Sequence, residues 1–338
     1  MSCRLLQKKE RLFEMSRSRA LFFTLFILLF IFIVVFFYFF FTRHPVSISK
    51  EMDWAIAIYQ GESPFDLAPA PGVKNPVIRA CDVSDVKAEY VADPFMVSFA
   101  GQWYMFFEVM NALTNQGDIG YATSQDGLSW EYKKIVLDEP FHLSYPYVFY
   151  WDGHFYMIPE SAKGGAIRLY RADNFPESWS FIGNLIAGEF ADNSVFYEKD
   201  TWWILTCSKP HSHDELRLFF ADNLMGPWTE HPASPIVQGD ATKAQPGGRV
   251  LVSDDRIIRF AHYDKKTYGK KVLAFFITEL SRTEYSERVY ENNPVLKGGP
   301  KGWNRHGMHH IDAHEIAPGK WIAAVDGYRK HLTIKIEY

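Results

Sequence analysis

The sequence lacks the excess of positive charge that a nucleic-acid-binding protein needs. Its 338 residues carry 36 Lys and Arg against 40 Asp and Glu, which gives a net charge of −4 and an isoelectric point near 6.3. Binding to a phosphate backbone depends on a broad basic surface. We therefore exclude nucleic acid as a partner.

Cysteine is also scarce, with three in the chain. Cys81 and Cys207 either pair or remain free thiols, because sequence does not show whether their Cα atoms come close enough to be bridged. No Asn-x-Ser/Thr sequon occurs, so nothing indicates N-glycosylation. No Ser-His-Asp or Cys-His arrangement is legible, and no motif predicts an organic cofactor.

Near its N-terminus the chain has one long apolar run. Residues 21–41 carry no charge and include ten Phe, and a helix of this length spans roughly 30 Å, the thickness of a bilayer's hydrocarbon core. Six basic residues precede the run, whereas only Arg43 and Lys50 follow it closely, so the positive-inside rule places the N-terminus in the cytoplasm.

These features predict a single-pass type II membrane protein anchored in the lipid bilayer. Its segments are a cytoplasmic tail (1–20), a transmembrane signal anchor (21–41), a stem (42–53) and a lumenal, periplasmic or extracellular domain (54–338). Aromatic residues make up 17% of the chain, which suits both pleated strands and sugar-binding clefts.

A repeat runs through the large domain. Tyr121-Ala122 is followed by Trp130, and similar aromatic strands lead to Trp179 and Trp228, so that successive tryptophans are 49 residues apart. Such a period is typical of repeat architectures. We expect the three rings to occupy equivalent places in successive units, packed between neighbouring sheets.

A second pattern precedes each aromatic strand: a short strand, a tight polar turn and another strand. Asp-Gly and Pro-Gly turns between apolar runs are hairpin signals. Five copies begin near residues 93, 145, 192, 247 and 312. Each copy therefore starts about 50 residues, or somewhat more, after the one before it. This spacing predicts an all-β fold, a five-bladed β-propeller, closed by strands at 54–59 and 332–336. The fixed landmarks argue against a two-sheet sandwich.

In a propeller, the first strand of each blade lines a central channel. The residues that begin these strands are Asp93, Tyr145, Asp192, Gly247 or Gly248, and Asp312. Carboxyl groups that converge on one axis repel each other, so their pKa values separate. One group is then able to act as a base while its neighbour keeps a proton.

The motifs Ala92-Asp93-Pro94, the Asp192-centred start of the third blade and Ser124-x-Asp126-Gly127-x-x-Trp130 resemble the five-bladed clan of family 43 and family 32 glycoside hydrolases. From about Trp54 onward, the chain also resembles the N-terminal domain of plant glucosamine inositolphosphorylceramide transferases. That resemblance is strongest over 93–235. In those proteins a transferase domain follows this module, and we expect this chain to lack that domain.

The family 43 resemblance implies that Asp93 is the general base and that Asp192 tunes the pKa of the acid and orients the sugar. The general acid of that family is a Glu at the start of the fourth blade, where this chain has Gln245-Pro-Gly-Gly-Arg249. Glu108 and Glu160, which end the second strands of the first two blades, are the stand-in acids, because apolar surroundings raise a carboxyl pKa. A structural role for each remains the alternative.

The predicted catalytic residues are therefore Asp93, Asp192, Glu160 and Glu108, with the first two carboxylates within roughly 10 Å of each other in a pocket with aromatic walls. Pro94 is expected to hold Asp93 extended. The substrate-binding candidates are Tyr145, His142, Arg249, His310 and Asp312. The histidines at 306–314 fit no closed zinc pattern; they line the channel or hold a structural cation.

We expect a carbohydrate-active protein that acts on a glycan or glycolipid by glycosyl transfer or hydrolysis at the channel mouth. The alternative, favoured by the missing Glu in the fourth blade, is a glycan-binding module or a scaffold without catalysis. The resemblance to the plant transferases also implies a possible partner glycosyltransferase.

The predicted topology has a direct test. Protease added to intact cells or sealed vesicles with the lumenal side outward should digest the part after residue 41 and spare the first 20 residues. Immunoblots against tags at the two ends give the result, with detergent-permeabilised samples as the control. Protection of the C-terminal tag in sealed samples would reverse the orientation.

Overall fold

The computed structural model of this chain describes residues 2–43, 46–253, 256–265 and 267–336. It comprises two units: Met1–Glu51 together with His331–Tyr338, called the anchor unit below, and Met52–Lys330, called the propeller unit.

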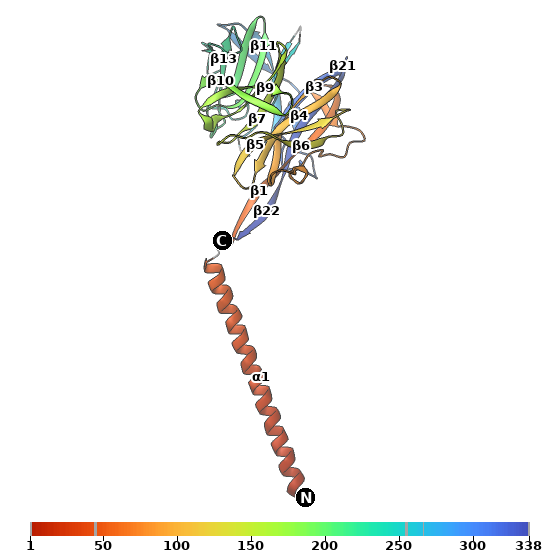
Figure 1. The fold of residues 1–338 in the computed structure, drawn as a ribbon, viewed down its shortest axis with the longest axis vertical. Helices are drawn as coiled ribbons and strands as arrows, with labels where there is room; N and C mark the ends of the chain where they lie inside the picture. Colours follow the sequence, from red (N-terminus) through yellow and green to blue (C-terminus); the bar gives the residue numbers. More distant parts are fainter. Residues whose placement is uncertain (1, 44–45, 254–255, 266, 337–338) are drawn as a thin grey trace. The chain divides into compact units, whose positions relative to one another are not determined.

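The anchor unit contains one continuous helix, α1 (Ser2–Arg43) (Figure 1). Its part Leu21–Arg43 is long and apolar enough to cross a membrane. The large apolar side chains over 21–41 are exposed on all sides of this helix, apart from a half-buried Phe40. A helix that is hydrophobic all round needs an apolar environment, so the segment fits the predicted single-pass anchor.

The propeller unit contains five antiparallel sheets, and the five-bladed prediction is confirmed. Blade one consists of β3 (Ala88–Phe99), β4 (Gln102–Asn111), β5 (Gln116–Ser124) and β6 (Glu131–Leu137). Blade two consists of β7 (Ser144–Trp151), β8 (His154–Glu160), β9 (Ala166–Asn174) and β10 (Ser178–Ala187). Blade three is β11 (Ala191–Glu198), β12 (Thr201–Cys207), β13 (Glu215–Ala221), β14 (Thr229–Glu230) and β15 (Val237–Gln238). Blade four is β16 (Leu251–Ser253), β17 (Arg256–His262), β18 (Lys271–Leu280), β19 (Tyr285–Val289) and β20 (Leu296–Lys297).

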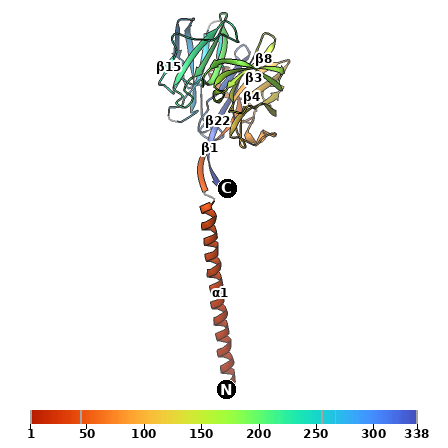
Figure 2. The same cartoon turned by 60° about the vertical axis from the view of Figure 1, so that its left-hand side comes forward.

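The fifth blade joins the two ends of the chain. Its strand order is β2-β1-β22-β21, with β2 (Asp66–Pro69), β1 (Val46–Ser63), β22 (Lys320–Ile336) and β21 (Ile311–Ala317). The labels β1 and β22 lie side by side in both ribbon views (Figures 1 and 2). The predicted closing strand at 54–59 is confirmed within β1, whereas 332–336 is the end of the long strand β22 and belongs to the anchor unit; the part of β22 in the propeller unit is Lys320–Lys330. Within the described residues, the helical elements of this unit are two short turns, η1 (Ala80–Asp82) and η2 (Ala162–Gly164).

The first strands of the blades are buried because neighbouring blades cover both of their faces. The central residues of β3, β7 and β11 are inaccessible, whereas β6 and β10 keep exposed positions. Tight turns link first to second strands: Asp152 and Gly153 have φ of 46° and 79°, and Lys199 and Asp200 have 51° and 56°. Positive φ at both central residues defines the turn type that the Asp-Gly signal predicted.

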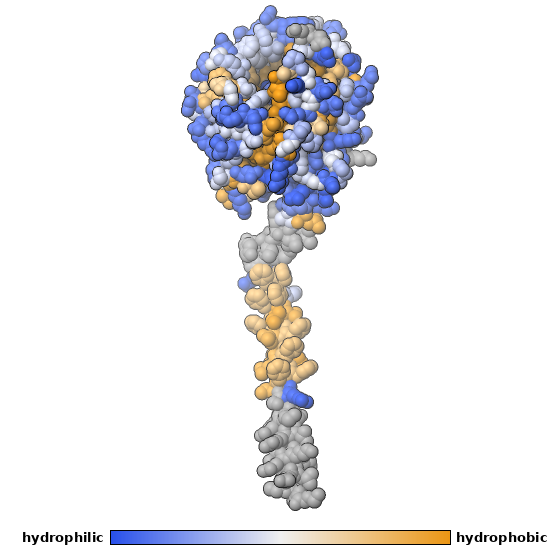
Figure 3. Space-filling model, turned by 90° about the vertical axis from the view of Figure 1, so that its right-hand side faces the viewer, coloured by the Kyte–Doolittle hydropathy of each residue, from blue (hydrophilic) through white to orange (hydrophobic). Residues whose placement is uncertain are grey.

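Figure 3 shows hydrophobic residues gathered in an elongated hollow on one face of the propeller unit, bordered by hydrophilic residues. The cysteines of this unit are both free thiols; Cys207 is buried and Cys81 exposed. Of the two alternatives left open by the sequence, the structure therefore has the unpaired one.

The three periodic tryptophans occupy equivalent places, as predicted. Each indole N–H donates to a backbone carbonyl three or four residues earlier: Trp130 to Gly127, Trp179 to Pro176 and Trp228 to Leu224, at 2.9–3.1 Å. Each ring is half-buried and packs against a core cluster.

Trp179 illustrates the packing between neighbouring blades. Its ring lies on β10 of the second blade and meets Phe106 on β4 of the first blade edge to face, with centroids 5.5 Å apart. The ring therefore contributes to the interface between two sheets and not only to its own sheet.

We predict that Trp179→Ala lowers the free energy of unfolding by about 2–4 kcal/mol, somewhat less than a fully buried ring would, because the site is only half-buried. The matched control is Phe181→Ala on the same strand, whose ring is 48% exposed and should cost less than about 1 kcal/mol. Urea denaturation followed by circular dichroism measures both. Equal losses for the two variants would show that Trp179 does not hold the blades together.

Candidate active site

Three residues at the channel mouth adopt the left-handed backbone conformation at equivalent places. Asp93, Tyr145 and Asp192 have φ of 54°, 44° and 54°, each at a register irregularity between the first two strands of a blade. Such a bulge re-aims a side chain. The expectation that Pro94 holds Asp93 extended is wrong, because the bulge imposes the left-handed conformation, which Asp tolerates better than most residues.

The bulge also frees backbone N–H groups, and buried carboxylates accept them. Asp93 N–H donates to Asp326 Oδ2 at 3.1 Å, and Asp192 N–H donates to Glu160 Oε2 at 3.3 Å. A buried N–H without a partner would be costly. The strained backbone and the acidic cluster are therefore parts of one arrangement.

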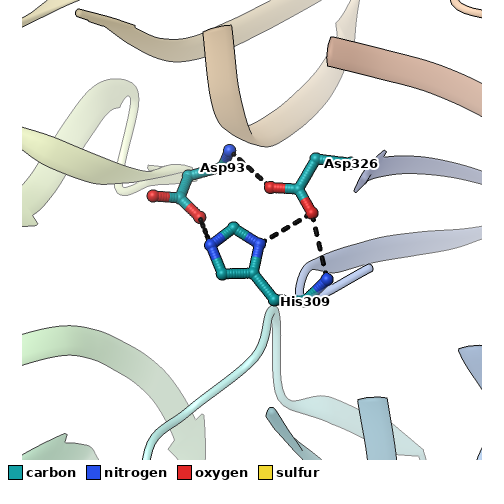
Figure 4. Close-up of side chains that lie close together, drawn as sticks. All are labelled: Asp93, His309 and Asp326. Atoms are coloured by element: carbon teal, nitrogen blue, oxygen red, sulfur yellow. Dashed lines mark hydrogen bonds and ion pairs between the residues drawn. The ribbon is translucent and has the colours of Figure 1, made fainter. Parts of the chain in front are cut away.

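Asp93 is linked to Asp326 through an imidazole (Figure 4). His309 Nε2 lies 3.6 Å from Asp93 Oδ1, and His309 Nδ1 lies 2.7 Å from Asp326 Oδ1. All three residues are at least 94% buried. Because Nδ1 donates to the carboxylate, Nε2 of a neutral His309 is an acceptor that faces Asp93.

Asp192 has a second imidazole and an amide as partners. Its Oδ2 accepts from Gln245 Nε2 at 2.5 Å and faces His262 Nε2 at 3.2 Å, while Asp264 lies 2.9 Å from the other nitrogen of His262. The imidazoles of His262 and His309 are neighbours, with ring centroids 5.2 Å apart. The two predicted catalytic aspartates are thus connected through two histidines, and their separation of roughly 10 Å stays a prediction.

Glu108 and Glu160 also belong to this cluster, as expected. Tyr90 donates to Glu108 Oε1 at 3.2 Å, and His142 Nε2 lies 3.5 Å from the same oxygen. His142 Nδ1 accepts from the Gly117 N–H at 2.8 Å, which leaves the ring proton on the nitrogen that faces Glu108. Glu160 is half-buried and so the more accessible of the two acids.

The environment divides the carboxyl groups into two classes. Burial, followed by repulsion from neighbouring carboxylates, raises the pKa of Asp93 and of Glu160 well above the usual range. Burial also raises the pKa of Glu108 to about 8, although the hydrogen bond from Tyr90 opposes this. Glu108 therefore keeps its proton at neutral pH, and Asp93 and Glu160 are shifted in the same direction.

The other two carboxyl groups ionise. Burial works against ionisation of Asp192 and Asp326, but contacts with His262 and His309 respectively outweigh it and lower both pKa values. Burial lowers the pKa of His262, but the carboxylates of Asp264 and Asp192 beside it outweigh burial and raise this pKa to about 10. Protonated and ionised carboxyl groups thus lie side by side, which is the arrangement that acid–base chemistry requires.

Aromatic rings border the site. Trp54 lies over His309 with centroids 4.1 Å apart and contacts Tyr328 at 4.4 Å, while Tyr268 lies 5.3 Å from both His262 and His309. These rings supply the aromatic wall that was expected. An enclosing pocket at this place stays a prediction.

The predicted substrate-binding residues divide into two groups. His142 and His310 lie in the acidic cluster; His310 Nδ1 is 3.6 Å from Asp93. Tyr145 lies at the bulge, and its hydroxyl is held by Ser194 and Gly248 at 2.7–2.9 Å.

Arg249 and Asp312 lie elsewhere in the channel. They pair with each other at 2.6 Å, and Asp312 accepts from the N–H of Met96, three residues beyond Asp93. The sequence led us to expect Asp312 at the place in the fifth blade that corresponds to Asp93 in the first. His309 and His310 lie there instead, so that expectation is wrong. Arg249 and Asp312 thus form an ion pair with each other, and Asp312 also interacts electrostatically with His310 of the acidic cluster.

Close packing explains why the start of the fourth blade has a glycine and no acid. A Cβ on Gly248 would lie 1.8 Å from the backbone oxygen of Ile311, so only glycine fits there. Gln245 supplies the polar contact to Asp192 that this blade contributes.

Sequence reasoning missed His262, Asp264 and Asp326 as members of the site, and it gave His309 only a shared role with the other histidines at 306–314, as channel lining or as cation ligands. Asp326 had a legible signal, since it follows the apolar run Ala323-Ala324-Val325, and a carboxylate in a buried run is seldom there without a partner. His262 and Asp264 carried no such signal.

Asp93, His309 and Asp326 can also hold a metal ion, because their ligand atoms all lie within 4.8 Å of one another. Both ring nitrogens of the neighbouring His310 are buried without a hydrogen-bond partner among the described residues. A cation bound there would compete with the hydrogen bond between His309 and Asp326. The structural cation expected from the sequence therefore stays a prediction.

Comparison with solved structures supports the fold. The chain is similar to the catalytic domain of the GH62 α-L-arabinofuranosidase of Coprinopsis cinerea, with a TM-score of 0.55, 11% identity and coverage of 82% of this chain and 97% of that one. It is also similar to a thermostable family-43 glycoside hydrolase, with a TM-score of 0.51, 16% identity and coverage of 72% and 92%. At these identities the likeness shows the propeller alone.

Sequence comparison is more specific. The chain is 36% identical over 300 residues to the glucosamine inositolphosphorylceramide transferase 1 of Oryza sativa subsp. japonica and 33% identical to that of Arabidopsis thaliana, covering 82% of this chain in both cases. It spans about two fifths of the length of these relatives, namely 40% and 39%.

A family model described as the N-terminal region of glucosamine inositolphosphorylceramide transferase 1 matches residues 46–328, which includes every member of the acidic cluster. The chain therefore belongs to this N-terminal family.

Proposed function

We propose that this protein is a membrane-anchored, carbohydrate-active enzyme that acts on a glycan or glycolipid at the acidic cluster, by glycosyl transfer or hydrolysis. The observation that carries the proposal is a cluster of five buried or half-buried carboxyl groups joined through two imidazoles, in which three pKa values are raised and two are lowered. Carboxyl groups whose pKa values are driven apart in this way are concentrated at functional sites.

Glycosyl chemistry needs a proton donor for the leaving oxygen and a base for the attacking hydroxyl. We assign the donor to Glu160, because its pKa is raised well above the usual range and it is the more accessible of the two glutamates. Asp192 next to it stays ionised, and its backbone N–H holds the Glu160 carboxyl in place. Its negative charge favours a positively charged transition state at the sugar carbon.

We assign the base to Asp93, assisted by His309. Burial and neighbouring carboxylates raise the pKa of Asp93, and His309 Nε2 lies 3.6 Å from its Oδ1. His309, held by Asp326 at 2.7 Å, is placed to share a proton with Asp93 and to leave it as a carboxylate. The carboxylate of Asp93 then accepts the proton of an attacking sugar hydroxyl or water.

A glycolipid is the substrate class favoured within this proposal. The named relatives are transferases of an inositolphosphorylceramide, which is a lipid, and this chain carries an apolar helix of membrane-spanning length. A glycosyltransferase is the partner proposed here, because the named relatives are transferases.

The second candidate function is sugar binding without turnover. Gln245 favours it, because an amide at the fourth blade takes a hydrogen-bonding position next to Asp192 and cannot donate the proton of a carboxylic acid.

The first test is mutation of the proposed acid and base. Turnover of aryl glycosides and nucleotide sugars by the full chain in detergent should fall about 10²–10⁴-fold in Asp93→Asn and Glu160→Gln, the usual contribution of acid–base catalysis. Asn tolerates positive φ, so Asp93→Asn should preserve the backbone. Glu131→Gln, an exposed acid on β6, is the matched control and should keep full turnover.

Retention of turnover in both active-site variants would contradict the enzymatic assignment. Sugar binding with no turnover of any substrate by the unmodified protein would instead leave the binding module as the function.

The pH dependence of stability provides a second test. Burial raises the pKa of Glu108 in the folded state to about 8, whereas in the unfolded state its pKa is the ordinary 4.5. Between these values the unfolded state binds fewer protons, so this group makes the protein less stable as the pH rises. Glu108→Gln should therefore lose less stability than the unmodified protein between pH 5 and pH 8 in urea denaturation.

Glu215→Gln is the control of opposite sign. Hydrogen bonding to Lys209 lowers the pKa of Glu215 to about 2, so its contribution is present above the unfolded pKa and is lost as the pH falls toward 2. Parallel pH profiles for the unmodified protein and Glu108→Gln would contradict the raised pKa of Glu108.

A further inference from the structure

A cavity of about 650 Å³ lies at the end of the inner strands opposite to the acidic cluster. Its lining includes Phe99 at the end of β3, Tyr150 near the end of β7 and His314 in β21. Asp93 and Phe99 are separated by six residues of strand, which is roughly 20 Å at the usual rise. The cavity is therefore distinct from the proposed active site, and its volume suits a small ligand.

Aromatic rings form one side of the cavity. Phe99 and Tyr150 are 45% and 53% exposed, and both pack against Phe155, with centroids 5.1 and 4.9 Å away. Phe155 in turn stacks on Phe175 at 3.6 Å. Phe155 thus supports the two exposed rings from beneath. Because these rings are already held in place, their side chains lose little entropy when a ligand covers them.

Hydrogen-bond acceptors form another side. His314 Nε2 lies 2.8 Å from Asp312 Oδ2, and pairing with Arg249 helps keep that carboxylate ionised. Since Nε2 is engaged by this carboxylate, Nδ1 is the ring nitrogen left for a ligand. The adjacent Glu315 is exposed and adds a carboxylate, of which Oε1 already accepts from the N–H of Gly319 at 2.9 Å.

The lining excludes an anionic ligand, because among the described residues that line this cavity none is Lys or Arg. The remaining carboxylate, that of Asp126, is already occupied by the N–H groups of Leu128 and Ser129 in its own turn. The cavity thus offers braced ring faces together with acceptors and no cation. A neutral sugar matches this, since its C–H face covers a ring while its hydroxyls donate to the acceptors.

We propose that this cavity is a second carbohydrate-binding site, which holds a neutral oligosaccharide apart from the acidic cluster. Phe99 and Tyr150 contact the apolar face of the sugar, while Glu315 and His314 Nδ1 accept from its hydroxyls. The site goes beyond the proposed function, because it supplies binding without acid–base chemistry.

The test is a binding measurement on the full chain in detergent, with neutral oligosaccharides of glucose, mannose, galactose, xylose and arabinose as probes. Calorimetry should detect binding by the unmodified protein. Tyr150→Ala should weaken this binding about fivefold to tenfold, which is the scale of one aromatic contact. Glu315→Gln, an exposed change that does not threaten the fold, should weaken it by a similar factor. Phe181→Ala and Glu131→Gln are the matched controls and should leave it unchanged.

Asp93→Asn separates the two sites, since it should abolish turnover and leave this binding intact. The proposal is overturned if no probe binds, if binding survives both Tyr150→Ala and Glu315→Gln, or if it is lost only in Asp93→Asn. It is equally overturned if tetramethylammonium binds in place of the sugars, because the rings and Glu315 would then form a cation site. Failure of the enzymatic proposal would show as absent turnover with this binding preserved.

Discussion

The propeller depends on closure between its last and first blades, and the buried carboxylate of Asp326 takes part in that closure. From β22 of the fifth blade, it accepts hydrogen bonds from the N–H of Asp93 in the first blade at 3.1 Å and from the N–H groups of His309 and His310 at 3.2 and 3.0 Å. One carboxylate thus satisfies backbone groups on both sides of the seam. The candidate active site lies where the ring closes.

This arrangement explains how so many acids are buried together. Burying five carboxyl groups would be prohibitive if all were charged, and the cluster avoids this cost in two ways. Burial and neighbouring carboxylates raise the pKa values of Asp93, Glu108 and Glu160 and so favour their neutral forms, while Asp192 and Asp326 lie against imidazoles. The packing of the cluster and the proposed chemistry therefore involve the same histidines.

The Arg249–Asp312 pair separates the two ends of the channel. Arg249 donates to the carbonyl groups of Met96 and Val148 and to Asp312, which holds three first strands together at mid-depth. Toward one end lies the acidic cluster and toward the other the aromatic cavity, where His314 takes the second oxygen of Asp312. A buried ion pair of this kind gives specificity of packing more than stability.

Local patterns in the sequence determined the fold class. The apolar run at 21–41, the 49-residue spacing of the tryptophans and the Asp-Gly turns each depend on interactions between residues close in the chain, so the anchor helix and the blades were predictable. Asp93, Asp192, Glu108 and Glu160 were also predictable, because repeats place equivalent residues at equivalent ends of their strands.

Tertiary structure alone decided how these acids act. His262 is 70 residues away from Asp192, and Asp326 is 233 residues away from Asp93, so no local pattern announces these two pairings. The left-handed conformation of Asp93 arises from a bulge in strand pairing, against the preference that Pro94 imposes locally. A pKa depends on burial and on charges brought near by the fold, and those distances are set only when the five blades close.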